Sequence, residues 1–121
     1  MSEVTLESQL IDIIKDEDMA ENIKLAKIDM LIKLGVDVNA RGSSNHSALN
    51  WASLFGHKEI VELLIQNGAD VNQKDNESQN AMMVAYDNET KKAIMDAVKK
   101  RNEKENGGSF FSKIKKRIRG R

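Results

Sequence analysis

The residues of this chain that could support catalysis or bind a metal are two histidines and several acidic side chains. His46 and His57 lie eleven positions apart, with no third ligand at the spacing that a zinc site requires. We therefore expect His57 to make structural hydrogen bonds at a turn between two helices, and His46 to lie on the surface of a turn. Residues 16–18 are consecutive carboxylates, so their side chains diverge and cannot act together as acid and base on one substrate.

Other catalytic and metal-binding patterns are missing from the sequence. The chain has no Cys, which excludes a thiol nucleophile, a thiolate metal site and a disulfide. Residues 75–86 are only faintly similar to a calcium loop, because Asn80 and Tyr86 stand where that loop has Gly and Glu. Neither a glycine-rich phosphate loop nor a nucleophile with its base is visible. We expect no enzyme activity, no metal and no cofactor.

The composition indicates one globular domain that is held together by aliphatic side chains. Of 121 residues, 40% are hydrophobic but only 4% are aromatic, so Ile, Leu, Val, Ala and Met must form the core. The N-terminus is acidic, and no stretch approaches the ~18 apolar residues of a membrane span. A soluble, cytoplasmic chain is expected.

A period of 33 residues organises the chain. The segment GVDVNA at 35–40 superposes on GADVNQ at 68–73. With the same offset, residues 60–65 land on 27–32 and on 93–98, and each of these segments predicts an amphipathic helix.

Local signals mark where the helices of each unit begin and end. Ser47 and Asn80 stand where N-caps of a shorter, preceding helix are needed. Gly35 and Gly68 stand where a longer helix ends in a left-handed residue. Each unit therefore predicts a turn, a short helix, a long helix and a second turn.

The second unit resembles the ankyrin repeat. SALNWA from Ser47, GH from Gly56 and GADVN from Gly68 follow the order and spacing of the family's T-P-L-H-x-A, G-H and exit signatures. The third unit keeps NAMMVA from Asn80, and the first keeps only the exit motif. The resemblance implies an all-α ankyrin-repeat solenoid of about three stacked helical hairpins joined by β-turn loops, which acts as a non-catalytic protein-protein interaction module.

We expect four segments along the chain: a diverged N-terminal capping hairpin (1–38), a consensus-like repeat (39–71), a C-terminal capping repeat (72–105) and a flexible basic tail (106–121). The two end units show polarity to solvent, because the position of Ile60 becomes Lys27 in the first unit and that of Leu63 becomes Asp96 in the third.

Asn50 and Met83 stand where the family's histidine usually ties neighbouring loops together. Asn can still donate and accept hydrogen bonds, whereas Met cannot donate one. The third unit is therefore expected to be looser than the second, or terminal.

In the resembled family, partners are usually bound by the turn tips and the exposed side of the short helices. Mapped onto this sequence, that surface comprises Ser43, Ser44, His46, Leu54 and Phe55 in the second unit, and Asn76, Glu77, Gln79, Asp87 and Asn88 in the third. Leu54 and Phe55 form an apolar pair that either anchors a partner or packs against the neighbouring hairpin, and Trp51 is expected in the core. We expect a monomer whose partner is another protein.

Charge is divided unevenly along the chain. Residues 1–98 carry nine basic and 17 acidic side chains, whereas residues 99–121 carry ten and two. A flexible hinge is predicted at 107–109, followed by a basic amphipathic segment. Its candidate contact residues are Phe110, Phe111, Lys113, Lys115, Lys116, Arg117 and Arg119.

Four interpretations of this tail remain open: a solvated tail, docking against the acidic body or a partner, an anchor on an anionic membrane, and a nucleic-acid or import-type signal. The interleaved Phe and Ile favour a lipid or a groove, so nucleic acid is not the expected partner. The alternative function is a membrane-surface adaptor that is targeted by the tail. The resemblance also allows delivery into a host cell, as with small ankyrin proteins of intracellular bacteria, and the richness in Lys, Ile and Asn is compatible with an AT-rich genome.

Overall fold

The fold is described from a computed structural model, which covers residues 5–42 and 45–119, with side chains described up to Glu103. Six α-helices follow one another in this part of the chain. They are α1 (Leu6–Lys15), α2 (Glu21–Lys33), α3 (Ala48–Leu54), α4 (Lys58–Gln66), α5 (Ala81–Val84) and α6 (Asn88–Arg119). The described backbone contains no strand, only one β-bridge between Arg41 and Ser47. The predicted all-α fold is confirmed.

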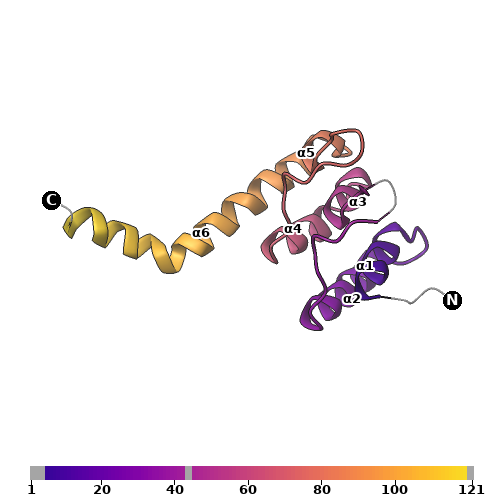
Figure 1. Cartoon of the computed structure of the whole chain (residues 1–121), viewed down its shortest axis with the longest axis horizontal. Coiled ribbons are helices and arrows are strands. Elements are labelled where there is room, and N and C mark those ends of the chain that lie inside the picture. Colours follow the sequence, from indigo (N-terminus) through magenta and orange to yellow (C-terminus); the bar gives the residue numbers. More distant parts are fainter. Residues whose placement is uncertain (1–4, 43–44, 120–121) are drawn as a thin grey trace.

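The helices pair into three hairpins that stack side by side (Figure 1). α3 packs against α1 and α5, and α4 packs against α2 and α6. The first helices of the hairpins therefore form one layer and the second helices another. The most deeply buried large side chains, each at most 1% exposed, are Leu10, Ile14, Ile28, Leu49, Ile60, Val61, Leu64 and Ile65.

Polar caps set the points at which α3 and α5 begin. The Ser47 hydroxyl accepts a hydrogen bond from the backbone N–H of Asn50 at 3.1 Å. The Asn80 side-chain oxygen accepts one from the N–H of Met83 at 3.0 Å. Both N-caps predicted from the sequence are confirmed.

Two glycines end the second helices of the first two hairpins. Gly35 has φ +95° and Gly68 has φ +98°, in the left-handed region that glycine adopts without strain. The N–H groups of Gly68 and Ala69 donate to the carbonyls of Ile65 and Leu64 at 3.1 and 3.0 Å. These bonds pair the last carbonyls of α4 and confirm the predicted helix end.

The turn tips of the second and third repeats share one backbone geometry. Asn45 and Ser78 occupy equivalent positions and have φ of 63° and 62°. The N–H of Asp75 donates to the carbonyl of Gln79 at 3.0 Å, and the N–H of Gly42 makes the equivalent bond in the second repeat. The 33-residue period thus extends from the helices into the turns.

The third repeat replaces the glycine exit with a continuous helix. Arg101 stands at the position of Gly68, and α6 runs on past it to Arg119. The Arg101 guanidinium donates to the carbonyls of Ile65 and Ala69 at 3.1 and 2.8 Å, which fastens α6 to the end of α4. Figure 1 shows the outer part of α6 leading away from the stack.

Residues 107–109, for which a hinge is predicted, lie within α6 and do not separate two elements. The flexibility of residues 106–121 stays a prediction.

Replacing Gly68 by Val is expected to lower the free energy of unfolding by about 1–3 kcal/mol, because a β-branched residue is strained at this positive φ. A Cβ at Gly35 or Gly68 would meet no atom within 4 Å, so backbone strain is the cost that the two sites share. The loss should be smaller for Gly35→Val, because Asn39 and Arg101 also bond to carbonyls of the Gly68 turn. Denaturant unfolding measures both losses. A Gly68→Val midpoint equal to that of the wild type would contradict the repeat assignment.

Candidate functional site

A row of four aromatic rings crosses the first-helix side of the second repeat. The ring centroids of His46 and Trp51 lie 4.9 Å apart, those of Trp51 and Phe55 5.6 Å, and those of Phe55 and His57 6.0 Å. His46 comes from the turn tip, Trp51 and Phe55 from α3 and its C-cap, and His57 from the N-cap of α4. Trp51 and Phe55 meet because side chains four positions apart lie on the same helix face. We call these four residues the aromatic row.

Both ends of the aromatic row are tied to neighbouring repeats. His57 Nδ1 lies 2.9 Å from Oε1 of Glu21 in α2, which confirms the structural role predicted for this histidine. His46 Nδ1 lies 3.4 Å from Oδ2 of Asp75 in the third repeat. The prediction that His46 lies on the turn surface is correct only in part, because its side chain is half-buried, at 18% exposure, where it packs between Trp51 and Asp75.

Trp51 lies between the core and the surface. Part of its side chain packs against the buried cluster, so the core position predicted for it is correct only in part. The ammonium of Lys15, the last residue of α1, lies 4.7 Å from the Trp51 ring centroid, which is a cation–π distance. The first repeat therefore adds a positive charge to the aromatic row.

Leu54 and Phe55 are 39% and 37% exposed, so neither is a core residue. Phe55 nevertheless packs on one side against Trp51 and His57. Phe55 also lines a hollow whose remaining lining comes from the end of α1, the acidic turn and α2, together with His57. The apolar pair is thus accessible while Phe55 is partly held in place.

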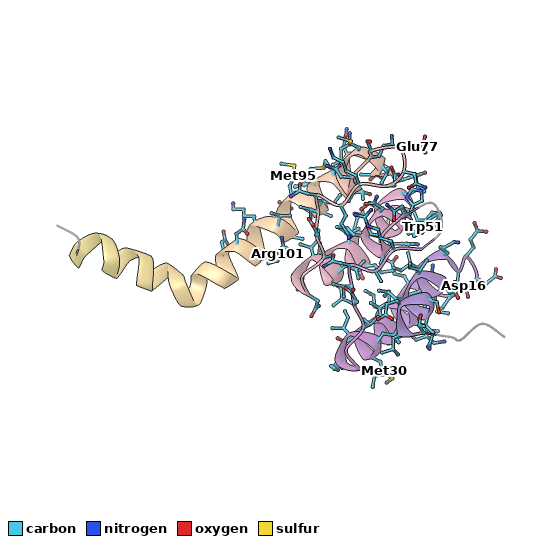
Figure 2. The ribbon with its side chains drawn as sticks, viewed as in Figure 1. Asp16, Met30, Trp51, Glu77, Met95 and Arg101 are labelled. Carbon is cyan, nitrogen blue, oxygen red and sulfur yellow. The ribbon has the colours of Figure 1, made fainter. Side chains whose placement is uncertain are left out.

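The predicted residues of the third repeat, Asn76, Glu77, Gln79, Asp87 and Asn88, are all exposed. Figure 2 shows Asp16, Trp51 and Glu77 on one side of the stack and Arg101 on the other. We call the surface formed by the turn tips with α1, α3 and α5 the first-helix face.

Ser43 and Ser44 lie outside the described residues, as do the side chains of the tail contact residues at 110–119. The membrane-adaptor alternative, which depends on that tail, stays a prediction.

Asn50 connects the second and third repeats as the sequence predicts. Its side-chain N–H donates to the carbonyl of Gln79 at 3.2 Å. Met83, at the equivalent position of the third repeat, is 59% exposed. Of these two positions, the one occupied by Asn50 makes the polar contact with the next repeat.

Sequence reasoning missed two residues of the first-helix face, Lys15 and Tyr86. Tyr86 is 72% exposed, and its N–H donates to the carbonyl of Ser53 at 2.9 Å. Its ring packs over Gly56, where an added Cβ would lie 3.1 Å from the ring. Both residues contact a different repeat, so no local pattern marks them.

Asp75 organises the tip of the third repeat. Its Oδ1 accepts hydrogen bonds from the N–H groups of Gln79 and Glu77 at 2.9 and 2.8 Å. The bond from Gln79, then that from Glu77 and the nearby His46, hold the pKa of Asp75 below its ordinary value, although burial acts in the opposite direction. Asp75 is therefore a buried, structural carboxylate within a surface of exposed polar residues.

Asp87 plays a similar part at the start of α6. It accepts hydrogen bonds from the hydroxyl and the N–H of Thr90 at 2.6 and 2.8 Å. These bonds, the hydroxyl bond first, hold the pKa of Asp87 below its ordinary value. Nearby, a hydrogen bond to Glu89 raises the pKa of Lys58 and joins α4 to α6.

The side chains of the first-helix face suit contact with another molecule. In the part of the chain with described residues, no group of three or more His, Cys, Asp or Glu side chains could hold a metal ion. Among the same residues, no helix is long and apolar enough to cross a bilayer. The face offers aromatic and aliphatic contact area that is edged by charged and amide side chains.

Comparisons with known proteins concern the repeats. A family model described as ankyrin repeats in three copies matches residues 18–104. The E3 ubiquitin-protein ligases Ufd4 of Drosophila melanogaster and hecd-1 of Caenorhabditis elegans are 44% and 41% identical over 64 residues, which is 53% of this chain and 2% of each ligase. The ankyrin repeat domain of Bcl-3, a member of the IkappaB family, has a TM-score of 0.62 and 30% identity over 71% of this chain and 35% of its own.

Asp75→Asn is expected to lower the melting temperature at pH 7, because the amide keeps an acceptor but loses the charge. A folded pKa below the unfolded value of about 3.9 stabilises the fold fully above about pH 4, and this contribution is lost as pH falls through the lowered pKa. The difference between variant and wild type should therefore shrink below pH 4. Thermal melts from pH 2 to 7 test this, with the exposed Asp12→Asn as control, and a difference that does not change with pH would contradict it.

Phe55→Asp is expected to cost only about 1–2 kcal/mol of unfolding free energy, because the side chain is already more than a third exposed and loses mainly its ring contacts. A carboxylate in the core would cost several kcal/mol. A circular-dichroism melt separates these outcomes. A collapse of the melting transition would show that Phe55 belongs to the core and cannot anchor a partner.

Proposed function

Because the chain belongs to the ankyrin repeat family, we propose that it is a non-catalytic module that binds another protein through its first-helix face. Ankyrin repeats generally act as protein-protein interaction modules. The ligases named above are far longer than this chain, which spans about 2% of their length, so their catalytic activity is not transferred to it.

The observation that carries this proposal is the aromatic row with its exposed apolar edge. In protein interfaces a few aromatic and aliphatic side chains supply most of the binding energy, and a polar rim fixes orientation. Leu54 and Phe55 supply accessible apolar area, and the Trp51 ring packs against that of Phe55. Since His46 and His57 are tied to neighbouring repeats, the row is held in place before a partner arrives, which lowers the entropic cost of binding.

The charges around the row indicate what kind of segment fits. The turn after α1 contributes three consecutive carboxylates at 16–18, and the third repeat contributes the exposed Glu77 and Asp87. The ammonium of Lys15 lies over the Trp51 ring. We therefore favour a partner segment with an apolar anchor flanked by basic side chains, since opposite charges at the rim steer association and fix register.

Selection from a displayed peptide library, with the full chain as bait, tests the proposal. Trp51 is the only Trp in the chain, so its fluorescence reports directly on the first-helix face. Selected peptides should shift that emission, and Leu54→Asp should weaken their binding at least about tenfold, or 1.4 kcal/mol.

Met30→Asp is the matched control, because Met30 is 63% exposed on α2 in the first repeat. Its affinities should equal those of the wild type. Peptides that bind equally well to Leu54→Asp and leave Trp51 emission unchanged would show that the partner surface lies elsewhere.

A further inference from the structure

The C-terminal end of the stack exposes an apolar groove. Its apolar lining comes from the turn before α5, from α5 and from α6, namely Val71, Met82, Ile94, Met95 and Val98. Met95 is 60% exposed, and Met82 and Val98 are half-buried. We call this groove the end face.

The end face repeats, one period later, a surface that the fold buries. Subtracting 33 from four of its five apolar positions gives Val38, Leu49, Val61 and Ile65, which are at most 8% exposed. The fifth position, Met95, corresponds to Glu62, which is half-buried. α6 packs against α4 and α5 against α3, so the third repeat covers this part of the second. The end face therefore lies where one more repeat-like layer would pack, although Ile94 is already buried within the third repeat.

The polar contacts of the docking surface are duplicated as well. Asn39 donates to the carbonyl of Gly68 at 3.1 Å and accepts from the N–H of Asp70 at 2.7 Å. Its equivalent, Asn72, is exposed. Lys58 pairs with Glu89 of the third repeat, whereas its equivalent, Lys91, is exposed. Within the described residues, neither Asn72 nor Lys91 makes the corresponding contact.

The following helix does not supply the missing layer. A further repeat would need a glycine turn where Arg101 stands, and the helix passes through that position up to Arg119. Figure 1 shows α6 leading outward and not back across the third hairpin. No described segment of the chain therefore covers the end face.

We propose that a second copy of this chain covers the end face, with end face against end face across a two-fold axis. Such an isologous contact buries both apolar grooves at once and closes without forming a fibre. A head-to-tail contact would instead bring Lys27, which replaces the buried Ile60 at the N-terminal end of the stack, against apolar side chains. This proposal of a dimer differs from the monomer that we expect from the sequence.

Charge complementarity supports a second copy as the occupant. Residues 106–121 carry six basic and no acidic side chains, whereas residues 1–98 carry 17 acidic and nine basic ones. α6 leads this basic segment away from its own repeats (Figure 1). Two α6 helices that run antiparallel across the axis would direct each basic segment toward the acidic repeats of the other copy.

Sedimentation velocity of the full chain from about 1 to 200 μM tests the proposal. The wild type should reach twice the 13.6 kDa mass of one chain. Met95→Glu should raise the dimer dissociation constant at least about tenfold, because it would place an unpaired charge in a desolvated contact. Its helical circular dichroism should be unchanged, since Met95 is exposed in the single chain.

Met30→Glu is the matched control, and Figure 2 shows Met30 at the opposite end of the stack from Met95. This variant should dimerise like the wild type. A monomer at every concentration would overturn the proposal, and so would a dimer that Met95→Glu leaves intact or that Met30→Glu dissociates. None of these outcomes bears on peptide binding at Leu54, so failure here is distinguishable from failure of the proposed function.

Discussion

Burial of aliphatic side chains between adjacent hairpins is the interaction on which the rest of the structure depends. With so few aromatic residues, the chain relies on Ile60, Leu64 and Ile65, none of which is accessible to solvent, to join the second repeat to its neighbours. No single hairpin could bury such side chains by itself. The polar ties between repeats, such as Asn39 to Gly68 and Asn50 to Gln79, fix the register of a stack that apolar packing holds together.

The same stacking determines where recognition can occur. The second hairpin packs against both neighbours through α4 and through two sides of α3, which leaves its turn tip and the outer side of α3 for other contacts. The four residues of the aromatic row all belong to the second repeat, but Lys15 of the first repeat contacts Trp51 and Asp75 of the third contacts His46. The row is therefore held in its position only when the three repeats are stacked. A variant that loses the stacking of the repeats should therefore also lose the arrangement of the aromatic row.

Local features of this structure were predictable from the sequence, and contacts between repeats mostly were not. The Ser47 and Asn80 caps and the left-handed Gly68 follow from signals within a few residues, so their prediction is confirmed. The half-buried position of His46 depends on Asp75, and the environment of Trp51 depends on Lys15, both far away along the chain. The Asn50 tie was an exception, because the family pattern names the position that joins the loops.

We propose above that partners bind the first-helix face. The most direct test compares the amide NMR shifts of the full chain with and without a peptide selected for binding. Each backbone amide gives its own signal, so the spectrum shows which helices and turns the peptide contacts. We expect the largest changes at residues 45–57 and 75–88, together with the Trp51 indole signal. Changes concentrated instead in α2 and α4 would contradict it.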